Sequence, residues 1–188
     1  KKITMKIKNL KKGMLLGVFV LASTVVLAQE TKMVGGAEMY PTKNIVENAV
    51  NSKDHTTLVA AVKAADLVET LQSDGPFTVF APTNKAFEAL PEGTVEMLLK
   101  PENKEKLQAV LTYHVIAGKM DAKALMDAVK NGMGKAMLKT VNGEELTVMQ
   151  KGKKLWIMDA KGNKAKVTIA DVYQSNGVIH VINTVLLP

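Results

Sequence analysis

The spacing of apolar residues changes once along this chain, near residues 131–135, and this change constrains the fold more than any other feature. Before it, apolar residues recur every three or four positions, as they do along one face of a helix. After it, short β-rich runs are separated by glycine-containing turns. The pattern predicts an α+β fold with a helical first half and a mainly antiparallel β second half.

One strand is expected within the helical half. Residues 77–81 (FTVFA) form a β-rich run that is closed by Pro82. Thr83 or Asn84 is then available to cap the next helix, since both side chains can accept a hydrogen bond from its first free N–H groups. A strand, a turn and a helix should therefore follow one another within about a dozen residues.

A later helix carries a histidine on its apolar face. It begins after Pro101, and His114 follows three apolar residues at helical intervals (Leu107, Val110 and Leu111). We expect His114 to be buried and to lock the helix to a strand by hydrogen bonds, with the segment of Thr83 and Asn84 as its partner. Tyr113 lies one position off that face and is the expected surface residue.

Five strands are expected after residue 135, at residues 136–140, 146–150, 155–158, 166–172 and 178–187. Asn176-Gly177 predicts a type I′ turn between the last two, because that turn needs positive φ at both central residues. His180 alternates with apolar residues on the last strand, so a structural role is expected for it as well. Asp171, in the preceding strand, is its expected partner across the turn.

The first 40 residues predict export rather than a folded unit. Six lysines and no acidic residue precede position 13, a 14-residue apolar run covers residues 14–27, and Ala28 ends a small-residue exit. This order is typical of a secretory signal peptide, residues 1–28, and the run is short of the ~20 residues that an uncleaved membrane anchor needs. Residues 29–40, with Gly35-Gly36, are interpreted as a linker, and the domain as residues 41–188.

Composition excludes several classes of protein. The 188 residues contain no cysteine, which rules out disulfides, thiolate zinc sites and thiol catalysis. After removal of the signal peptide, 19 lysines face 18 acidic residues, a net charge of +1, and the chain has no arginine. Nucleic-acid binding is therefore not expected, and contact with a membrane is expected only through an uncleaved signal segment.

The residues typical of enzymes are not grouped in this sequence. The three histidines lie far apart, and none has the i, i+4 partner of a helical zinc site. None of the four serines lies in a G-x-S-x-G motif. We therefore expect no catalytic residue, no metal site and no cofactor.

Three segments together resemble the fasciclin domain family. They are residues 75–87 (GPFTVFAPTNKAF), residues 111–118 (LTYHVIAG) and residues 169–188 (IADVYQSNGVIHVINTVLLP). Their order and separation match across almost all of residues 41–188. The resemblance implies a β-wedge or sandwich flanked by helices. Its motif residues, with structural or interaction roles, are Thr83, Asn84, Tyr113, His114, Asp171, Asn176, Gly177 and His180.

The same resemblance implies a function. It favours a secreted or periplasmic, noncatalytic domain for adhesion or surface interaction, whose partner is a cell-surface or matrix protein or a polysaccharide. Some members of the family bring the tyrosine-histidine segment into contact with integrins, which makes Tyr113 the expected contact residue here. The alternative is a carrier of an apolar small molecule such as a carotenoid, which the resemblance implies because some family members resemble carotenoid-binding proteins. The methionines of residues 120–137, which pack adaptably, agree with it.

Overall fold

The computed structural model describes residues 30–188, so the expected signal peptide, residues 1–28, lies outside the described residues. Seven strands form one sheet in the order β4-β3-β9-β8-β7-β6-β5. All neighbours pair antiparallel except β3 and β9, which run parallel. The strands are β3 (Phe77–Pro82), β4 (Val115–Ala117), β5 (Lys135–Lys139), β6 (Glu145–Lys151), β7 (Lys154–Met158), β8 (Lys164–Gln174) and β9 (Gly177–Ile182).

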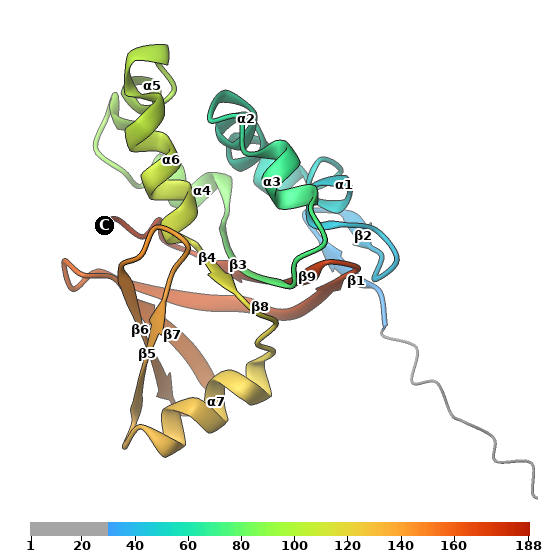
Figure 1. Cartoon of the computed structure of the whole chain (residues 1–188), viewed down its shortest axis with the longest axis vertical. Helices are drawn as coiled ribbons and strands as arrows, with labels where there is room; N and C mark the ends of the chain where they lie inside the picture. Colours follow the sequence, from blue (N-terminus) through green and yellow to red (C-terminus); the bar gives the residue numbers. More distant parts are fainter. Residues whose placement is uncertain (1–29) are drawn as a thin grey trace, which may run out of the picture.

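The helices are short and fall into two groups, which confirms the α+β fold (Figure 1). Those before β4 gather at one end of the sheet, and α7 lies alone beside β5 and β6. The first group comprises α1 (Ile45–Ala49), the 3₁₀ turn η1 (Lys53–His55), α2 (Thr56–Ala64), α3 (Val68–Gln72), α4 (Asn84–Glu88), α5 (Thr94–Leu98), the 3₁₀ turn η2 (Pro101–Asn103) and α6 (Lys104–Tyr113). The last helix, α7, spans Ala122–Asn131.

Two large apolar cores lie on opposite sides of β3, because its side chains alternate in direction. Val79 and Ala81 belong to the core beneath α1, α2, α3 and α6. Phe80 belongs to the core between α7 and the strands β5–β8, where Leu125 and Val129 are also buried. Both cores therefore depend on this one strand, and the family segment that contains it holds the two halves of the fold together.

The closing hairpin of β8 and β9 forms as expected, but its turn is of a different type. Tyr173 pairs with Val178, and Gln174 with Gly177, so the loop is Ser175-Asn176. None of these loop and flanking residues has a positive φ, which excludes the predicted type I′ turn. The last strand also ends at Ile182, five residues earlier than expected.

The segment interpreted as a linker is instead a hairpin. β1 (Lys32–Val34) and β2 (Ala37–Met39) pair antiparallel around Gly35-Gly36, whose φ angles of 59° and 76° match a type I′ turn. An isolated two-stranded hairpin is marginal in water, so packing must stabilise it. Val34 and Met39 are both buried in the helical core, and the Lys32 Nζ donates to the Ala170 carbonyl at 2.7 Å.

Candidate functional site

The Thr83-Asn84 pair joins three parts of the fold. The Thr83 N–H donates to the Ile182 carbonyl on β9, and its own carbonyl accepts from the first turn of α4. The Asn84 Oδ1 accepts from the Thr57 N–H at 3.0 Å, and its Nδ2 donates to the Lys53 carbonyl at 2.9 Å. Asn84 thus caps the neighbouring helix α2 rather than its own helix, and its amide is occupied within the protein.

His114 is buried, and both of its ring nitrogens have partners. The Leu186 N–H donates to Nε2 at 3.0 Å, so Nε2 is an acceptor. Nδ1 must then carry the proton and donate to the Val110 carbonyl, 2.7 Å away. Burial lowers the pKa of His114 to about 4. The ring locks α6 to the closing segment, so the partner expected at Thr83-Asn84 was wrong.

Tyr113 is not a surface residue, and the interpretation of it as a solvent-facing contact residue is wrong. Its side chain is fully buried, and its hydroxyl donates to the Glu145 carbonyl and accepts from the Ala160 N–H, at 3.0 and 2.9 Å. The cause is the position of the end of α6 between two cores. Leu111 faces one core while Tyr113 faces the other, so helical spacing alone finds only one of the two buried faces.

His180 and Asp171 lie together, although not as an ion pair. The His180 Nδ1 accepts from the backbone N–H of Asp171 at 3.3 Å, and Nε2 is 2.9 Å from the Met120 carbonyl, to which it donates. The Asp171 carboxylate instead accepts from the Ala122 N–H at the start of α7. Burial lowers the pKa of His180, which favours the neutral ring, and that ring stacks on Phe80.

Asn176 and Gly177 fasten the closing turn to the helical layer. The Asn176 Oδ1 accepts from the Ile45 N–H, and its Nδ2 donates to the carbonyls of Leu71 and Ser73. A Cβ on Gly177 would lie 2.2 Å from the carbonyl oxygen of Phe77. Close approach of the parallel strand β3, and not a positive φ, is therefore what demands glycine at this position.

The eight motif residues therefore share no common surface. Six side chains are buried or use their polar groups for internal hydrogen bonds, which join α1, α6 and α7 to the sheet and its closing segments, and α2 to α4. Gly177 allows the backbone of β3 to approach the backbone of β9 closely, and Thr83 contributes backbone hydrogen bonds. These residues hold the scaffold together, and a contact site for a partner must be sought elsewhere.

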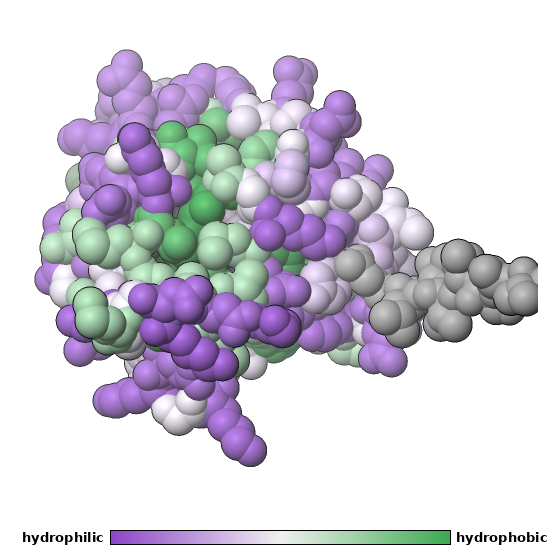
Figure 2. All heavy atoms as spheres, turned by 60° about the horizontal axis from the view of Figure 1, so that its bottom comes forward, coloured by the Kyte–Doolittle hydropathy of each residue, from purple (hydrophilic) through white to green (hydrophobic). Residues whose placement is uncertain are grey.

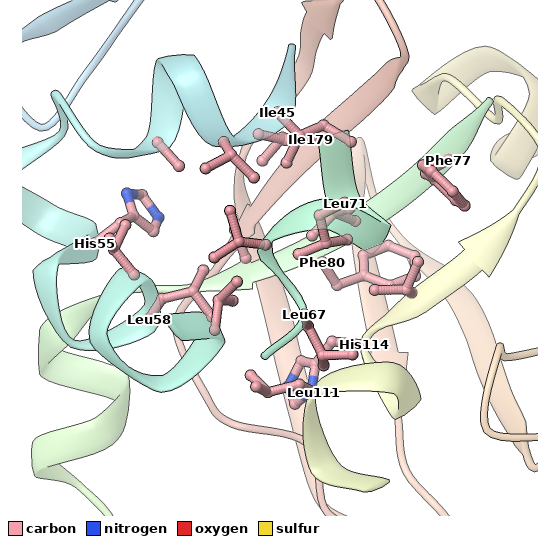
Figure 3. Close-up of a pocket in the computed structure, with 18 of the residues that line it drawn as sticks. Ile45, His55, Leu58, Leu67, Leu71, Phe77, Phe80, Leu111, His114 and Ile179 are labelled. Atoms are coloured by element: carbon pink, nitrogen blue, oxygen red, sulfur yellow. The ribbon is translucent and has the colours of Figure 1, made fainter. Parts of the chain in front are cut away.

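A deep apolar pocket lies between the helical layer and the sheet (Figure 3). It has a volume of about 80 Å³, and its walls come from α1, α2, α3, α6, β3 and β9, with Val34 and Met39 of the first hairpin closing one side. Its lining is almost entirely aliphatic or aromatic. The titratable residues at its walls are His55, His114 and Lys63.

His55 is the polar residue of this pocket that sequence reasoning missed. Its ring points toward the interior from one side, as Figure 3 shows, and its Nδ1 is 2.9 Å from the Ser52 hydroxyl. Its Nε2 is buried and has no hydrogen-bond partner in the described part of the chain. Burial lowers the pKa of His55, against opposing effects of the Ala81 backbone and of Asp54. No motif or periodic pattern surrounds His55 in the sequence, so the sequence gives no local signal for its place in the pocket.

Three further buried polar side chains also went unpredicted. The Asp159 carboxylate accepts from the backbone N–H groups of Lys161 and Asn163 and from that of Leu187 in the closing segment. The buried amides of Asn48 and Gln174 bond to each other and connect α1 to β8. Asp159 precedes a Lys-Gly turn, which is a local signal for an Asx turn, whereas nothing local pairs Asn48 with Gln174.

The described residues show neither a metal centre nor a spanning helix. Within residues 30–188 no three histidine or acidic side chains are grouped so that they could hold a metal ion. In the same range no helix has both the length and the apolar character needed to cross a bilayer.

Comparison with known proteins agrees with the fold. Residues 53–188 match the family model of the fasciclin domain. The solved structure of a FAS1 domain pair from the insect cell adhesion molecule Fasciclin I superposes with a TM-score of 0.70 at 19% identity, over 78% of this chain and 51% of that one. The chain belongs to the fasciclin domain family.

Relatives of known sequence occur in bacteria and animals. Protein sll1483 of Synechocystis is 51% identical over 160 residues, covering 85% of this chain and 82% of that protein. The immunogenic protein MPB70 of Mycobacterium bovis is 36% identical and covers 74% of this chain. The transforming growth factor-beta-induced protein ig-h3 of Sus scrofa is 42% identical over 70% of this chain, but the match spans 17% of that longer protein.

Proposed function

We propose that the protein is an exported, noncatalytic fasciclin domain that acts in adhesion or surface interaction. The observation that carries this proposal is the internal use of the motif side chains. The side chains that would supply reactive groups, such as His114, His180 and Asp171, make hydrogen bonds within the protein that hold helices to the sheet. What such a rigid scaffold offers to a partner is its outer surface. Membership of a family that includes an insect cell adhesion molecule supports the same function.

Binding by the purified mature protein tests this function directly. The labelled domain should bind to intact cells or to their extracellular polymer, saturably and in competition with unlabelled domain. A variant that removes the internal lock, His114→Ala, should lose binding only in proportion to its unfolded fraction. Absence of saturable binding by the folded wild-type domain would refute the proposal.

Export is the second part of the proposal. The lysine-rich start, the apolar run and the small-residue exit at Ala28 support cleavage that leaves Gln29 as the first residue. The intact mass of the protein recovered from the periplasm or the medium measures the cleavage site. Recovery of the full precursor from the membrane fraction would show that the apolar run acts as an anchor instead.

The pocket supports a second candidate function, the carriage of an apolar small molecule. Its aliphatic lining fits such a ligand, and the partnerless Nε2 of His55 could bond to one polar atom of it. The volume of about 80 Å³ is roughly half of the 150 Å³ cavity that holds benzene in another protein. It can therefore accept only a part of a molecule as long as a carotenoid. Native mass spectrometry of the purified protein, with its absorption spectrum, would reveal a carried ligand.

A further inference from the structure

Charge is unevenly distributed along this nearly neutral domain. Residues 130–166 contain nine lysines and three acidic residues, of which Asp159 is buried. Residues 30–129 contain ten lysines and fourteen acidic residues. The first range forms the end of α7, strands β5–β7 and the start of β8, and the second forms the helical layer, strands β1–β4 and most of α7. The far end of the sheet is thus strongly basic, although the net charge hides it.

The basic end carries an aromatic and methionine surface on one side. In β5–β8 the residues that pair across the sheet share a face, and one set is buried against α7 (Ala136, Val148, Ile157 and Ala165). The alternate positions form the opposite face, in two rows. They are Lys135, Met149, Trp156 and Lys166 in one row, and Met137, Thr147, Met158 and Lys164 in the next. We call this surface the outer face.

The outer face lies outside the apolar cores of residues 30–188. Trp156, Met149, Met158 and Met137 belong neither to the two large cores nor to the small cluster around Phe87 and Val185, and Met137 is 66% exposed. Viewed from this end of the molecule, long hydrophilic side chains project around apolar surface (Figure 2). An aromatic ring with three methionines on an open strand layer is the kind of exposed patch that marks an interaction site.

Six lysines frame these apolar side chains, namely Lys135, Lys139, Lys151, Lys154, Lys164 and Lys166. The ion pairs within residues 30–188 involve Lys104, Lys123 and Lys130, so none of the six is paired there. The ammonium groups of Lys154 and Lys166 lie close enough that Lys154 lowers the pKa of Lys166. The one acidic side chain in the register of this face is Glu145, opposite Lys139.

We propose that the outer face binds an acidic polysaccharide, with a sugar ring stacked on Trp156 and its carboxylate or sulfate groups on the surrounding lysines. The inference rests on the proposed function and names the class of partner. Charge complementarity favours a polyanion, and the apolar C–H face of a sugar ring suits an aromatic side chain. Lys135 and Lys166 are three strand spacings apart, roughly 14 Å, which a short oligosaccharide can span.

The same geometry disfavours an anionic membrane as the partner. A bilayer is entered by apolar side chains that protrude, as on an amphipathic helix. Trp156 is half-buried and stands in the middle of a strand, between Met149 and Lys166, rather than at the tip of a loop. A chain-like polymer can lie along such a surface without inserting anything into it.

The experiment uses the fluorescence of Trp156, the one tryptophan in the sequence. Alginate, a polymer of uronic acids, is titrated into the mature protein, with neutral dextran and phosphatidylserine vesicles as the competing probes. We expect alginate to shift the emission, with an affinity that falls as salt is raised, and dextran to cause no shift. A response to vesicles without one to alginate, or equal responses to alginate and dextran, would overturn the proposal.

Three variants test whether alginate binds to the outer face. Lys154→Gln/Lys166→Gln should weaken alginate binding about tenfold, since two favourable charge contacts are lost. Lys85→Gln/Lys106→Gln makes the same charge change on the exposed helical layer and should bind like the wild type. Trp156→Leu, followed by calorimetry, should bind more weakly with an unchanged salt dependence. Circular dichroism melts check that every variant is folded.

The result also separates this inference from the proposed function. If the wild type binds cells and the Lys154/Lys166 variant binds them equally well, the outer face is not the site, although the adhesive function stands. If the folded wild type binds neither cells nor any of the polymers, the proposed function itself fails.

Discussion

Replacement of Asn176 by alanine should weaken the attachment of the closing turn to the helical layer. The buried amide makes three hydrogen bonds, one to the N–H of Ile45 at the start of α1 and two to the carbonyls of Leu71 and Ser73. Each bond is worth about 1 kcal/mol net, and a partner left buried without a hydrogen bond adds to the loss. Asn176→Ala should therefore lower the free energy of unfolding by about 3 kcal/mol.

Urea unfolding, followed by far-UV circular dichroism, measures this loss. The midpoint should fall while the slope stays constant, because the variant changes stability and not the area exposed on unfolding. Asn103→Ala is the matched control, since that exposed amide makes one hydrogen bond, to the Met97 carbonyl, and should cost less than about 1 kcal/mol. A loss at Asn176 no larger than the loss at Asn103 would refute this account of the motif.

Three further substitutions or conditions test the same scaffold. Tyr113→Phe leaves the Glu145 carbonyl and the Ala160 N–H without their partner, which should cost about 1–3 kcal/mol by urea unfolding. Gly177→Ala places a Cβ 2.2 Å from a backbone oxygen and should cost about 2 kcal/mol, and an unchanged melting temperature would contradict this. His114 has its pKa lowered to about 4, so its neutral form stabilises the fold. That stability is present above pH 6.5 and is lost as the pH falls towards 4, by about 3 kcal/mol in total. A His114→Gln variant should show a shallower loss over this pH range.

Local patterns predicted the parts of the fold that depend on neighbouring residues. The change from helical to β spacing, the burial of His114 and the antiparallel closing hairpin all follow from periods of three to four or of two residues. The first hairpin escaped detection because its strands have three residues each, too few to show an alternating pattern. Two consecutive glycines such as Gly35-Gly36 are typical of a flexible linker, but a type I′ turn favours them as well.

Contacts between segments that lie far apart in the sequence could not be predicted from local patterns. Tyr113 is buried because β6 and the loop after β7 close over it, and nothing near it in the sequence says so. The need for glycine at position 177 comes from β3, which precedes it by 100 residues and pairs with it in parallel. The buried Nε2 of His55, which has no hydrogen-bond partner within residues 30–188, lies in a pocket whose walls come from the first hairpin, α2 and β3, and these are distant in the sequence.

The position of β9 has a consequence for how the chain can be made. This strand follows every other strand in the sequence, yet it lies between β3 and β8 in the sheet. A chain that emerges N-terminus first, from a ribosome or through a membrane pore, therefore lacks the strand that joins its two halves until synthesis or passage is almost finished. Until then β3 can pair only with β4, and β8 only with β7, so one edge of each strand stays open. The earlier segments remain a substrate for chaperones and proteases during that time. Folding of this domain is thus a late event, set by the arrival of the residues after position 176.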